Sequence, residues 1–177
     1  RPDWQPVTGP GVVLSGSCST ATRAQVAGYR QTRPSREITA EEVIAGAIDA
    51  KELADWALCQ ADAPLIYSSA EPEVVRAAQQ THGRARVAAA VEGFFSELAT
   101  GLVDRGVTRM IVAGGETSGA IVSALGIREC RIGPRLASGV PALRVAGSRP
   151  LALALKSGNF GGPDFFAEAL ASVEGEG

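Results

Sequence analysis

The chain has 177 residues, of which 45% are hydrophobic and 20% charged, and its formal net charge is −2. This balance is typical of one globular domain and excludes a disordered chain. The charge lacks the basic excess that nucleic-acid-binding proteins carry, and no apolar run approaches the roughly 20 residues that span a bilayer. We therefore expect a soluble domain with neither a nucleic-acid nor a membrane partner.

The predicted elements alternate between strands and helices. In order they are strand 11–15, a helix from Ser19 or Thr20 to about Arg30, a helical stretch 39–60 interrupted near 46–49, strand 64–68, short helix 71–80, helix 84–105, strand 109–113, glycine-rich turn 114–119, a helix to about 125, strands 129–132, 142–146 and 151–155, and helix 164–171. Residues 1–10, rich in Pro and Gly, are expected to be a linker before a domain over 11–177. The pattern predicts an α/β fold with a mostly parallel sheet flanked by helices and an antiparallel hairpin near the C-terminus.

Local signals support these boundaries. Thr39 followed three residues later by Glu42 matches a capping box. The longest predicted helix carries apolar residues at three- and four-residue spacing, which gives it one apolar face. They are Val87, Val91, Phe94, Phe95, Leu98 and Leu102.

Cysteine and histidine content restricts the chemistry. Cys18, Cys59 and Cys130 lack C-x-x-C spacing, which is typical of reduced thiols in the cytoplasm. The single histidine, His82, excludes a multi-histidine metal site, and we predict no metal-ligating residues. A Cys18–His82 nucleophile pair is a weak alternative, because nothing in the sequence orients His82. A start at Arg1 instead of Met indicates a fragment or a trimmed chain.

The turn at 114–119 is the strongest candidate for a ligand site. Gly114 and Gly115 follow a strand directly, so the backbone can turn sharply and approach a ligand closely. The next helix presents free N–H groups and a positive dipole end, which suit phosphate. Thr117 and Ser118 add hydroxyl groups. The equally open alternative is a tight turn in which Thr117 or Ser118 caps the helix and Glu116 favours the dipole.

Two further stretches follow predicted strands and have a similar composition. Residues 15–20 offer small hydroxyl side chains, and Ser17 is the better ligand candidate there because Ser19 is needed as the cap. Residues 156–162 offer Lys156, which could reach a phosphate, and Gly158; the alternative is a solvated lysine beside a flexible loop. Ligands of open α/β sheets bind beyond the carboxyl ends of the strands, where these turns are expected to lie.

Several nucleotide and hydrolase motifs are absent from the sequence. There is no G-x-x-x-x-G-K-[ST], which argues against a P-loop NTPase, and no G-x-G-x-x-G after a strand, which argues against a dinucleotide-binding oxidoreductase. There is also no G-x-S-x-G nucleophile elbow.

Three segments resemble the carboxyl-terminal nucleotide-binding domain of the four-carbon acid sugar kinases, the 3-oxo-tetronate, threonate and erythronate kinases. The segments are 13–19, 113–120 and 151–166, with shorter matches at 131–134 and 138–141. The resemblance implies an ATP-dependent kinase that phosphorylates the terminal hydroxyl of a four-carbon sugar acid. Phosphoryl transfer of this kind depends on Mg²⁺ bridging the phosphates, so we expect Mg²⁺ as a cofactor. It implies ATP contacts at Ser17, Gly114, Gly115, Glu116, Thr117 and Gly158, with Asn159 as a softer candidate.

The same resemblance limits what this chain is expected to do alone. Members of the family carry a preceding domain with an Asp-rich motif that binds the sugar acid, and that domain is absent here. No catalytic base is predicted in the chain, and homo-oligomerisation is left open. Two alternatives remain: a non-catalytic nucleotide-sensing or partner-docking module, and a glycerate-type kinase of another fold. The segments around Ser17 and Gly158 do not support the glycerate-type kinase.

Overall fold

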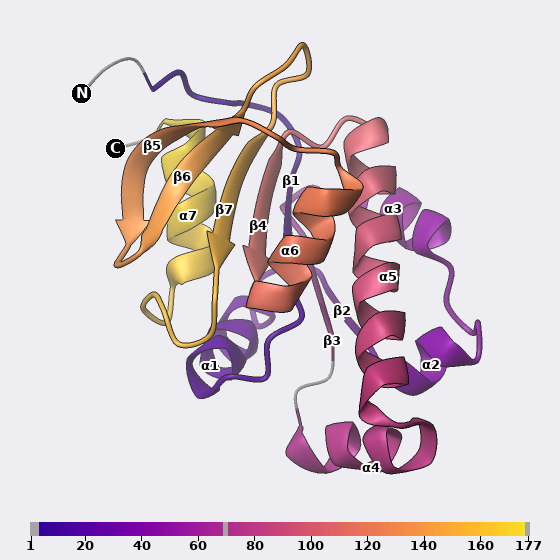
Figure 1. The fold of residues 1–177 in the computed structure, drawn as a ribbon. Coiled ribbons are helices and arrows are strands. Elements are labelled where there is room, and N and C mark those ends of the chain that lie inside the picture. Colours follow the sequence, from indigo (N-terminus) through magenta and orange to yellow (C-terminus); the bar gives the residue numbers. More distant parts are fainter. Residues whose placement is uncertain (1–3, 69–70, 176–177) are drawn as a thin grey trace.

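The computed structural model describes residues 4–68 and 71–175 (Figure 1). In that part of the chain, seven strands form one sheet in the order β2-β3-β1-β4-β7-β6-β5. The strands are β1 (Gly11–Ser15), β2 (Ser35–Ile38), β3 (Leu65–Ser68), β4 (Arg109–Ala113), β5 (Cys130–Ala137), β6 (Val140–Val145) and β7 (Ala152–Lys156). The helices are α1 (Thr20–Tyr29), α2 (Ala40–Ile44), α3 (Ala50–Leu58), α4 (Pro72–His82), α5 (Arg84–Asp104), α6 (Gly115–Ala124) and α7 (Phe165–Glu174).

The sheet is mixed in the way the sequence predicts. Neighbouring strands from β2 through β3, β1 and β4 to β7 are parallel. Strand β6 is antiparallel to both β5 and β7. The predicted α/β fold, with its antiparallel hairpin near the C-terminus, is therefore confirmed.

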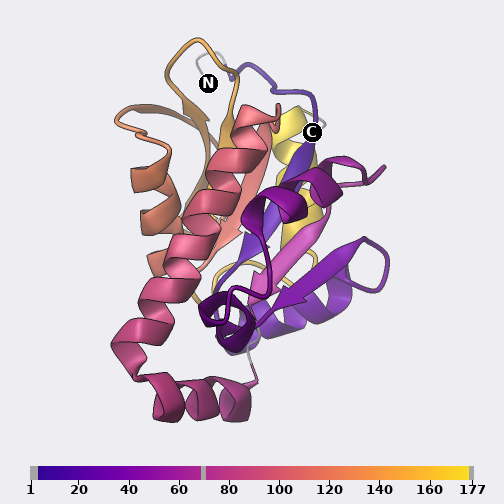
Figure 2. The same ribbon diagram turned by 90° about the vertical axis from the view of Figure 1, so that its right-hand side faces the viewer.

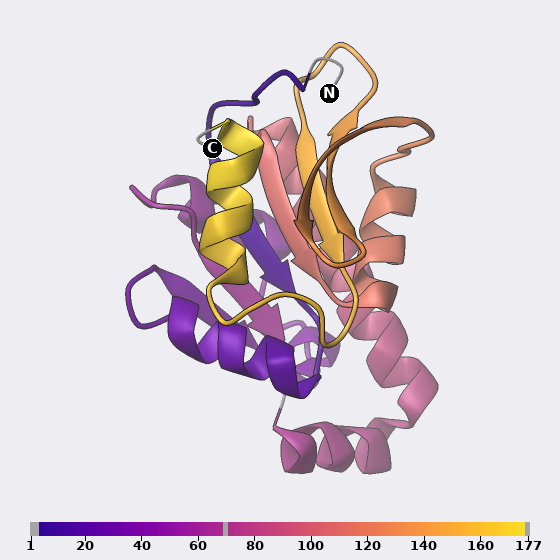
Figure 3. The same cartoon turned by 90° about the vertical axis from the view of Figure 1, so that its left-hand side faces the viewer.

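Helices bury both faces of the sheet. Helices α3, α5 and α6 cover one face (Figure 2), and α1 and α7 cover the other (Figure 3). Alternate residues of each central strand enter opposite cores: in β1, Val12 and Leu14 face α5 while Val13 faces α7. Because both faces are buried, the middle residues of the central strands are apolar, as in most parallel sheets, and polar residues stand only at the strand ends.

Strand β2 was not predicted from the sequence. It lies at the edge of the sheet and pairs in parallel with β3. Of its four residues only Ile38 is buried, while Arg36 and Glu37 are exposed. An edge strand needs only one apolar residue facing the core, so it lacks the hydrophobic signal of a central strand.

The other edge of the sheet also differs from the prediction. Strand β5 extends beyond Ile132 to Ala137 through Gly133 and Pro134, with register shifts in its pairing to β6. A proline is tolerated in an edge strand at such an irregularity. The ring of Trp4 packs so closely on Gly133 that a Cβ there would overlap it.

The residues before β1 pack against the domain. Residues 4–10 contain no helix or strand, yet Val7 is buried and its N–H donates to the carbonyl of Val173 at 3.1 Å. The segment therefore runs over the surface beside α7.

The predicted capping box begins α2, and it gives a test of local stability. Thr39 accepts from the Glu42 N–H at 3.2 Å, and the Glu42 carboxylate accepts from the Thr39 N–H at 2.8 Å. We expect Thr39→Ala to lower the free energy of unfolding by about 1 kcal/mol, measured by urea denaturation. Thr32→Ala, at an exposed residue after α1, is the control and should leave the midpoint unchanged.

Candidate functional site

The three turns singled out from the sequence meet at one edge of the sheet. They follow β1, β4 and β7, which are adjacent and parallel, so their carboxyl ends lie side by side. The N–H of Gly16 donates to the carbonyl of Ala113 at 2.9 Å, and the N–H of Gly114 donates to the carbonyl of Lys156 at 2.8 Å. Backbone hydrogen bonds therefore join each turn to the next.

The first two turns approach so closely that they require glycine. A Cβ on Gly16 would overlap the side chain of Thr117. Gly114 has a φ of +121°, which L side chains rarely adopt, and a Cβ on it would lie 3.3 Å from the N atom of Ser17. Glycine at both positions lets the backbones of two turns make one continuous surface.

The amino end of α6 is uncapped. The helix begins at Gly115, so the predicted turn over 114–119 is wrong in extent: only Gly114 lies before the helix. The first backbone hydrogen bond runs from the Ser118 N–H to the Gly114 carbonyl. Within residues 4–68 and 71–175, no acceptor is found for the N–H groups of Gly115, Glu116 and Thr117, and no side chain caps the helix.

This uncapped end has the properties of an anion site. The three N–H groups are oriented along the helix axis, and the helix dipole adds positive potential there. The hydroxyl of Ser118 is buried and likewise has no hydrogen-bond partner among the described residues. Polar groups without a protein partner normally form hydrogen bonds with water or with a ligand.

The amino end of α1, by contrast, is satisfied by the protein itself. Ser19 is the N-cap and accepts from the Thr22 N–H at 3.2 Å. The Ser17 hydroxyl oxygen accepts from the Ser19 N–H at 3.2 Å, and Asn159 Oδ1 accepts from the Ala21 N–H at 3.3 Å. Asn159 therefore caps a helix in this structure, whereas the proton of the Ser17 hydroxyl has no acceptor among the described residues and is available for a ligand.

Two residues of α1 that the sequence did not single out hold the loop after β7. The Thr22 hydroxyl donates to the Gly158 carbonyl at 3.0 Å. The buried amide of Gln25 donates to the carbonyls of Phe160, Gly161 and Gly162 at 3.2, 3.1 and 2.8 Å. Their three-residue spacing places them on one face of α1. This spacing is the sequence feature by which the pair could have been recognised.

Lys156 is buried, with an exposed fraction of 1%. The interpretation as a solvated lysine is therefore wrong. Its ammonium donates to Thr22 Oγ1 at 2.8 Å and to the Gly158 carbonyl at 2.7 Å. Burial lowers the pKa of this lysine from 10.5 to about 8.

The structure does not support a Cys18–His82 nucleophile pair. Cys18 is an exposed residue, but partial desolvation of its thiol raises the pKa, which disfavours the reactive thiolate. His82 Nε2 lies 2.9 Å from Glu41 Oε1, and no hydrogen bond joins His82 to Cys18. In the described part of the chain, no group of three or more acidic, histidine or cysteine side chains could hold a metal ion.

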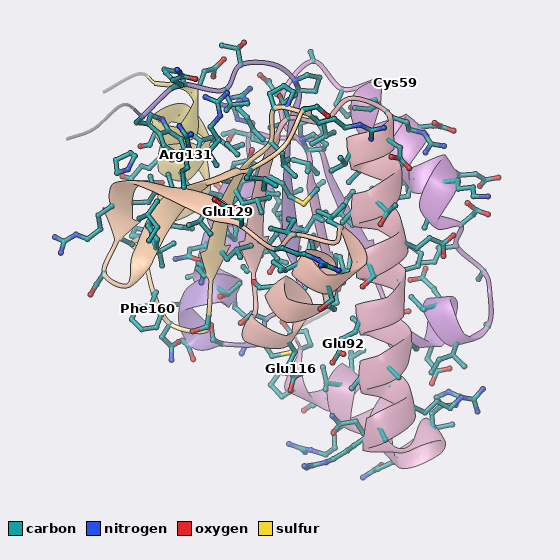
Figure 4. The ribbon with its side chains drawn as sticks, turned by 45° about the horizontal axis from the view of Figure 1, so that its top comes forward. Cys59, Glu92, Glu116, Glu129, Arg131 and Phe160 are labelled. Carbon is teal, nitrogen blue, oxygen red and sulfur yellow. The ribbon has the colours of Figure 1, made fainter. Side chains whose placement is uncertain are left out.

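A cavity of about 170 Å³ lies beside the uncapped helix end. Gly16, Cys18 and Thr117 line it from the turns, and Val74 and Ala78 line it from α4. Figure 4 shows Glu116 at the start of α6 and Glu92 on α5, both of which line this cavity, and Phe160 on the loop after β7. The anion site therefore opens toward a hollow that could admit a second group.

Glycine-rich turns that meet an uncapped helix at the carboxyl edge of a parallel sheet define an α/β phosphate-binding domain. Comparison of the sequence with known protein families identifies the family of this chain. Residues 12–166 match the family described as the nucleotide-binding C-terminal domain, and the chain belongs to it. The resemblance indicated by the sequence motifs is thereby confirmed.

Similar curated proteins are bacterial 3-oxo-tetronate kinases. That of Brucella melitensis is 49% identical over 97% of this chain and 40% of its own length. That of Cupriavidus necator is 48% identical over 96% of this chain and 39% of its own length. The chain thus spans about 40% of the length of these relatives.

Solved structures agree on the fold. A Haemophilus influenzae protein superposes with a TM-score of 0.87 at 39% identity, covering 94% of this chain and 41% of that one. A Bordetella bronchiseptica protein, a domain-swapped dimer with bound citrate, superposes with a TM-score of 0.76 at 19% identity over 94% of this chain and 41% of that one.

No helix in the described residues is long and apolar enough to cross a membrane.

Proposed function

We propose that this chain is the ATP-binding part of a kinase that phosphorylates a four-carbon sugar acid, 3-oxo-tetronate being the first candidate. The single observation that carries the proposal is the uncapped end of α6, where three N–H groups have no acceptor within the described residues. Three neighbouring free N–H groups at the positive end of a helix dipole suit a phosphate. The names of the relatives, 3-oxo-tetronate kinase, support the reaction class.

The residues of the three turns would contact different parts of the nucleotide. The N–H groups of Gly115, Glu116 and Thr117 would bind phosphate oxygens, and the Ser17 hydroxyl would donate from the neighbouring turn. Gly114 keeps that surface open because it has no side chain. The loop at Gly158 would lie against the nucleoside.

The transferring phosphoryl group carries charge on its outer oxygens, and catalysis depends on neutralising that charge and on alignment. Mg²⁺ bound to the phosphates would supply part of the neutralising charge. In this chain the α6 dipole and its N–H groups supply another part. Glu116, exposed at the start of α6, is the acidic side chain of the three turns and would orient water on the ion. We place the sugar acid and the base outside this chain.

Calorimetric titration with Mg-ATP tests the proposal directly. We expect saturable binding that competes with ADP and is absent with adenosine, because the site recognises phosphates. Lack of binding at high protein concentration, for a chain that is folded by circular dichroism, would remove the proposed function.

A phosphorylation assay distinguishes the kinase proposal from a non-catalytic nucleotide-binding module. Under the kinase proposal, we expect this chain alone to bind ATP without phosphorylating 3-oxo-tetronate. The longer protein of the same family should transfer phosphate to it. Nucleotide binding without turnover by any longer form would favour the sensing module.

A further inference from the structure

Lys156 is a buried cation without a carboxylate partner. Its side chain is 1% exposed, and no ion pair within the described residues includes it. Both of its acceptors, the Thr22 hydroxyl and the Gly158 carbonyl, are neutral. An unpaired buried charge is unfavourable for folding, and cores of this kind usually use an apolar residue instead. Stability alone therefore does not account for a lysine at this position.

The contacts of Lys156 reach all three turns. Its carbonyl accepts from the Gly114 N–H at 2.8 Å, beside the uncapped end of α6. Its ammonium donates to Thr22 Oγ1 on α1 and to the carbonyl of Gly158 at 2.8 and 2.7 Å. Thr22 in turn accepts from the hydroxyl of Ser19, which caps α1. One residue thus connects the turn after β1, the turn after β4 and the loop after β7.

We propose that Lys156 is the positioning residue of the nucleotide site: its ammonium fixes the Gly158 loop against α1, so that the three turns bind one nucleotide together. The inference rests on the proposed ATP site, and it extends that site to a side chain that need not touch the phosphates. The ammonium also places one positive charge beneath the three turns, where it attracts the bound anion.

Protonation of Lys156 then links nucleotide binding to pH. With a pKa of about 8 in the free protein, the ammonium is lost as the pH rises through that value. The neutral amine donates weaker hydrogen bonds and offers no charge, so affinity should fall as the pH rises. Phosphate groups themselves titrate lower, with a pKa of about 6. The titratable and charged side chains on the elements around Lys156 come from α1 and the turn before it (Cys18, Arg23, Tyr29), from β4 (Arg109), from α6 (Glu116), from β6 (Arg144), and from α7 and its N-cap (Asp164, Glu168, Glu174). None of them forms an ion pair with Lys156 within the described residues.

The test compares Lys156→Met with the wild type by Mg-ATP calorimetry between pH 7 and pH 9. We expect wild-type affinity to fall as the pH rises through about 8. The variant should bind roughly tenfold or more weakly at pH 7 and show no such fall. Its midpoint of thermal unfolding should be unchanged or higher, because a buried unpaired charge has been removed. A merely structural lysine would instead lose stability and affinity together.

Two control variants and one further test variant separate the possible outcomes. Lys51→Met replaces the other lysine of the chain, which is exposed on α3, and should leave the affinity and its pH dependence unchanged. Cys18→Ser removes the titratable thiol of the turn after β1 and should keep the pH dependence. Thr22→Val keeps Lys156 but removes one acceptor, and it should weaken binding even if Lys156→Met fails to fold.

The proposal is overturned if the wild type binds Mg-ATP without pH dependence, or if Lys156→Met keeps either the affinity or the pH profile. Wild-type affinity from Thr22→Val with an unchanged pH profile also overturns it. Failure of the wild-type chain to bind Mg-ATP at all contradicts the proposed function, and this result is distinct from the others.

Discussion

Gly114→Val is expected to abolish measurable Mg-ATP binding and to destabilise the fold. Gly114 has a φ of +121°, and a side chain there would meet Thr117 Oγ1 at 3.1 Å and the Ser17 N atom at 3.3 Å. A β-branched residue at this φ is strained by roughly 1–3 kcal/mol. The added methyl groups would also force apart the turns after β1 and β4. We expect at least a roughly hundredfold loss of affinity and about 2 kcal/mol less unfolding free energy, measured by calorimetry and urea denaturation.

Gly119→Ala is the matched control for that substitution. Gly119 lies within α6, five residues after Gly114, is exposed, and a Cβ there would have no atom within 4 Å. Alanine in place of a helical glycine should raise stability by roughly 0.5–1 kcal/mol and leave nucleotide affinity unchanged. If Gly114→Val bound Mg-ATP as tightly as Gly119→Ala, the assignment of the phosphates to the end of α6 would be wrong.

The sequence predicted the strands of the central sheet because their residues are apolar on both faces. Strands β1, β3, β4 and β7 each supply buried residues to two cores, so each appears as a continuous apolar run. The capping box at Thr39 and the apolar face of α5 were equally visible, since both depend on neighbours within one helix. Strand β2 was missed because its exposed residues, Arg36 and Glu37, carry no such pattern.

The site was predicted in outline for a similar reason. Glycines directly after strands identify turns where backbone approaches a ligand, and the parallel order of β1, β4 and β7 brings those turns together. What the sequence could not show is which hydrogen bonds are already made. Asn159 caps α1, 138 residues earlier in the chain, and the Lys156 ammonium reaches Thr22 across 134. Contacts at such separations leave no local pattern, so the uncapped end of α6 could be recognised only in three dimensions.

The second large effect is expected at Gln25, which connects α1 to the loop after β7. Its amide nitrogen has two hydrogens and lies 2.8 to 3.2 Å from three carbonyls, so at least one bond is shared. Gln25→Leu would fill the same space but leave those carbonyls without this donor. An unsatisfied group of this kind lowers stability by roughly 1–3 kcal/mol.

Because the loop carries Gly158, its release should also weaken nucleotide binding. We expect Gln25→Leu to lower the free energy of unfolding by about 2 kcal/mol and the affinity for Mg-ATP by roughly tenfold. Gln31→Leu, at an exposed residue just after α1, is the matched control and should change neither quantity. Equal affinities in the two variants would show that the nucleotide does not depend on the loop, and the site would then consist of the turns after β1 and β4 alone.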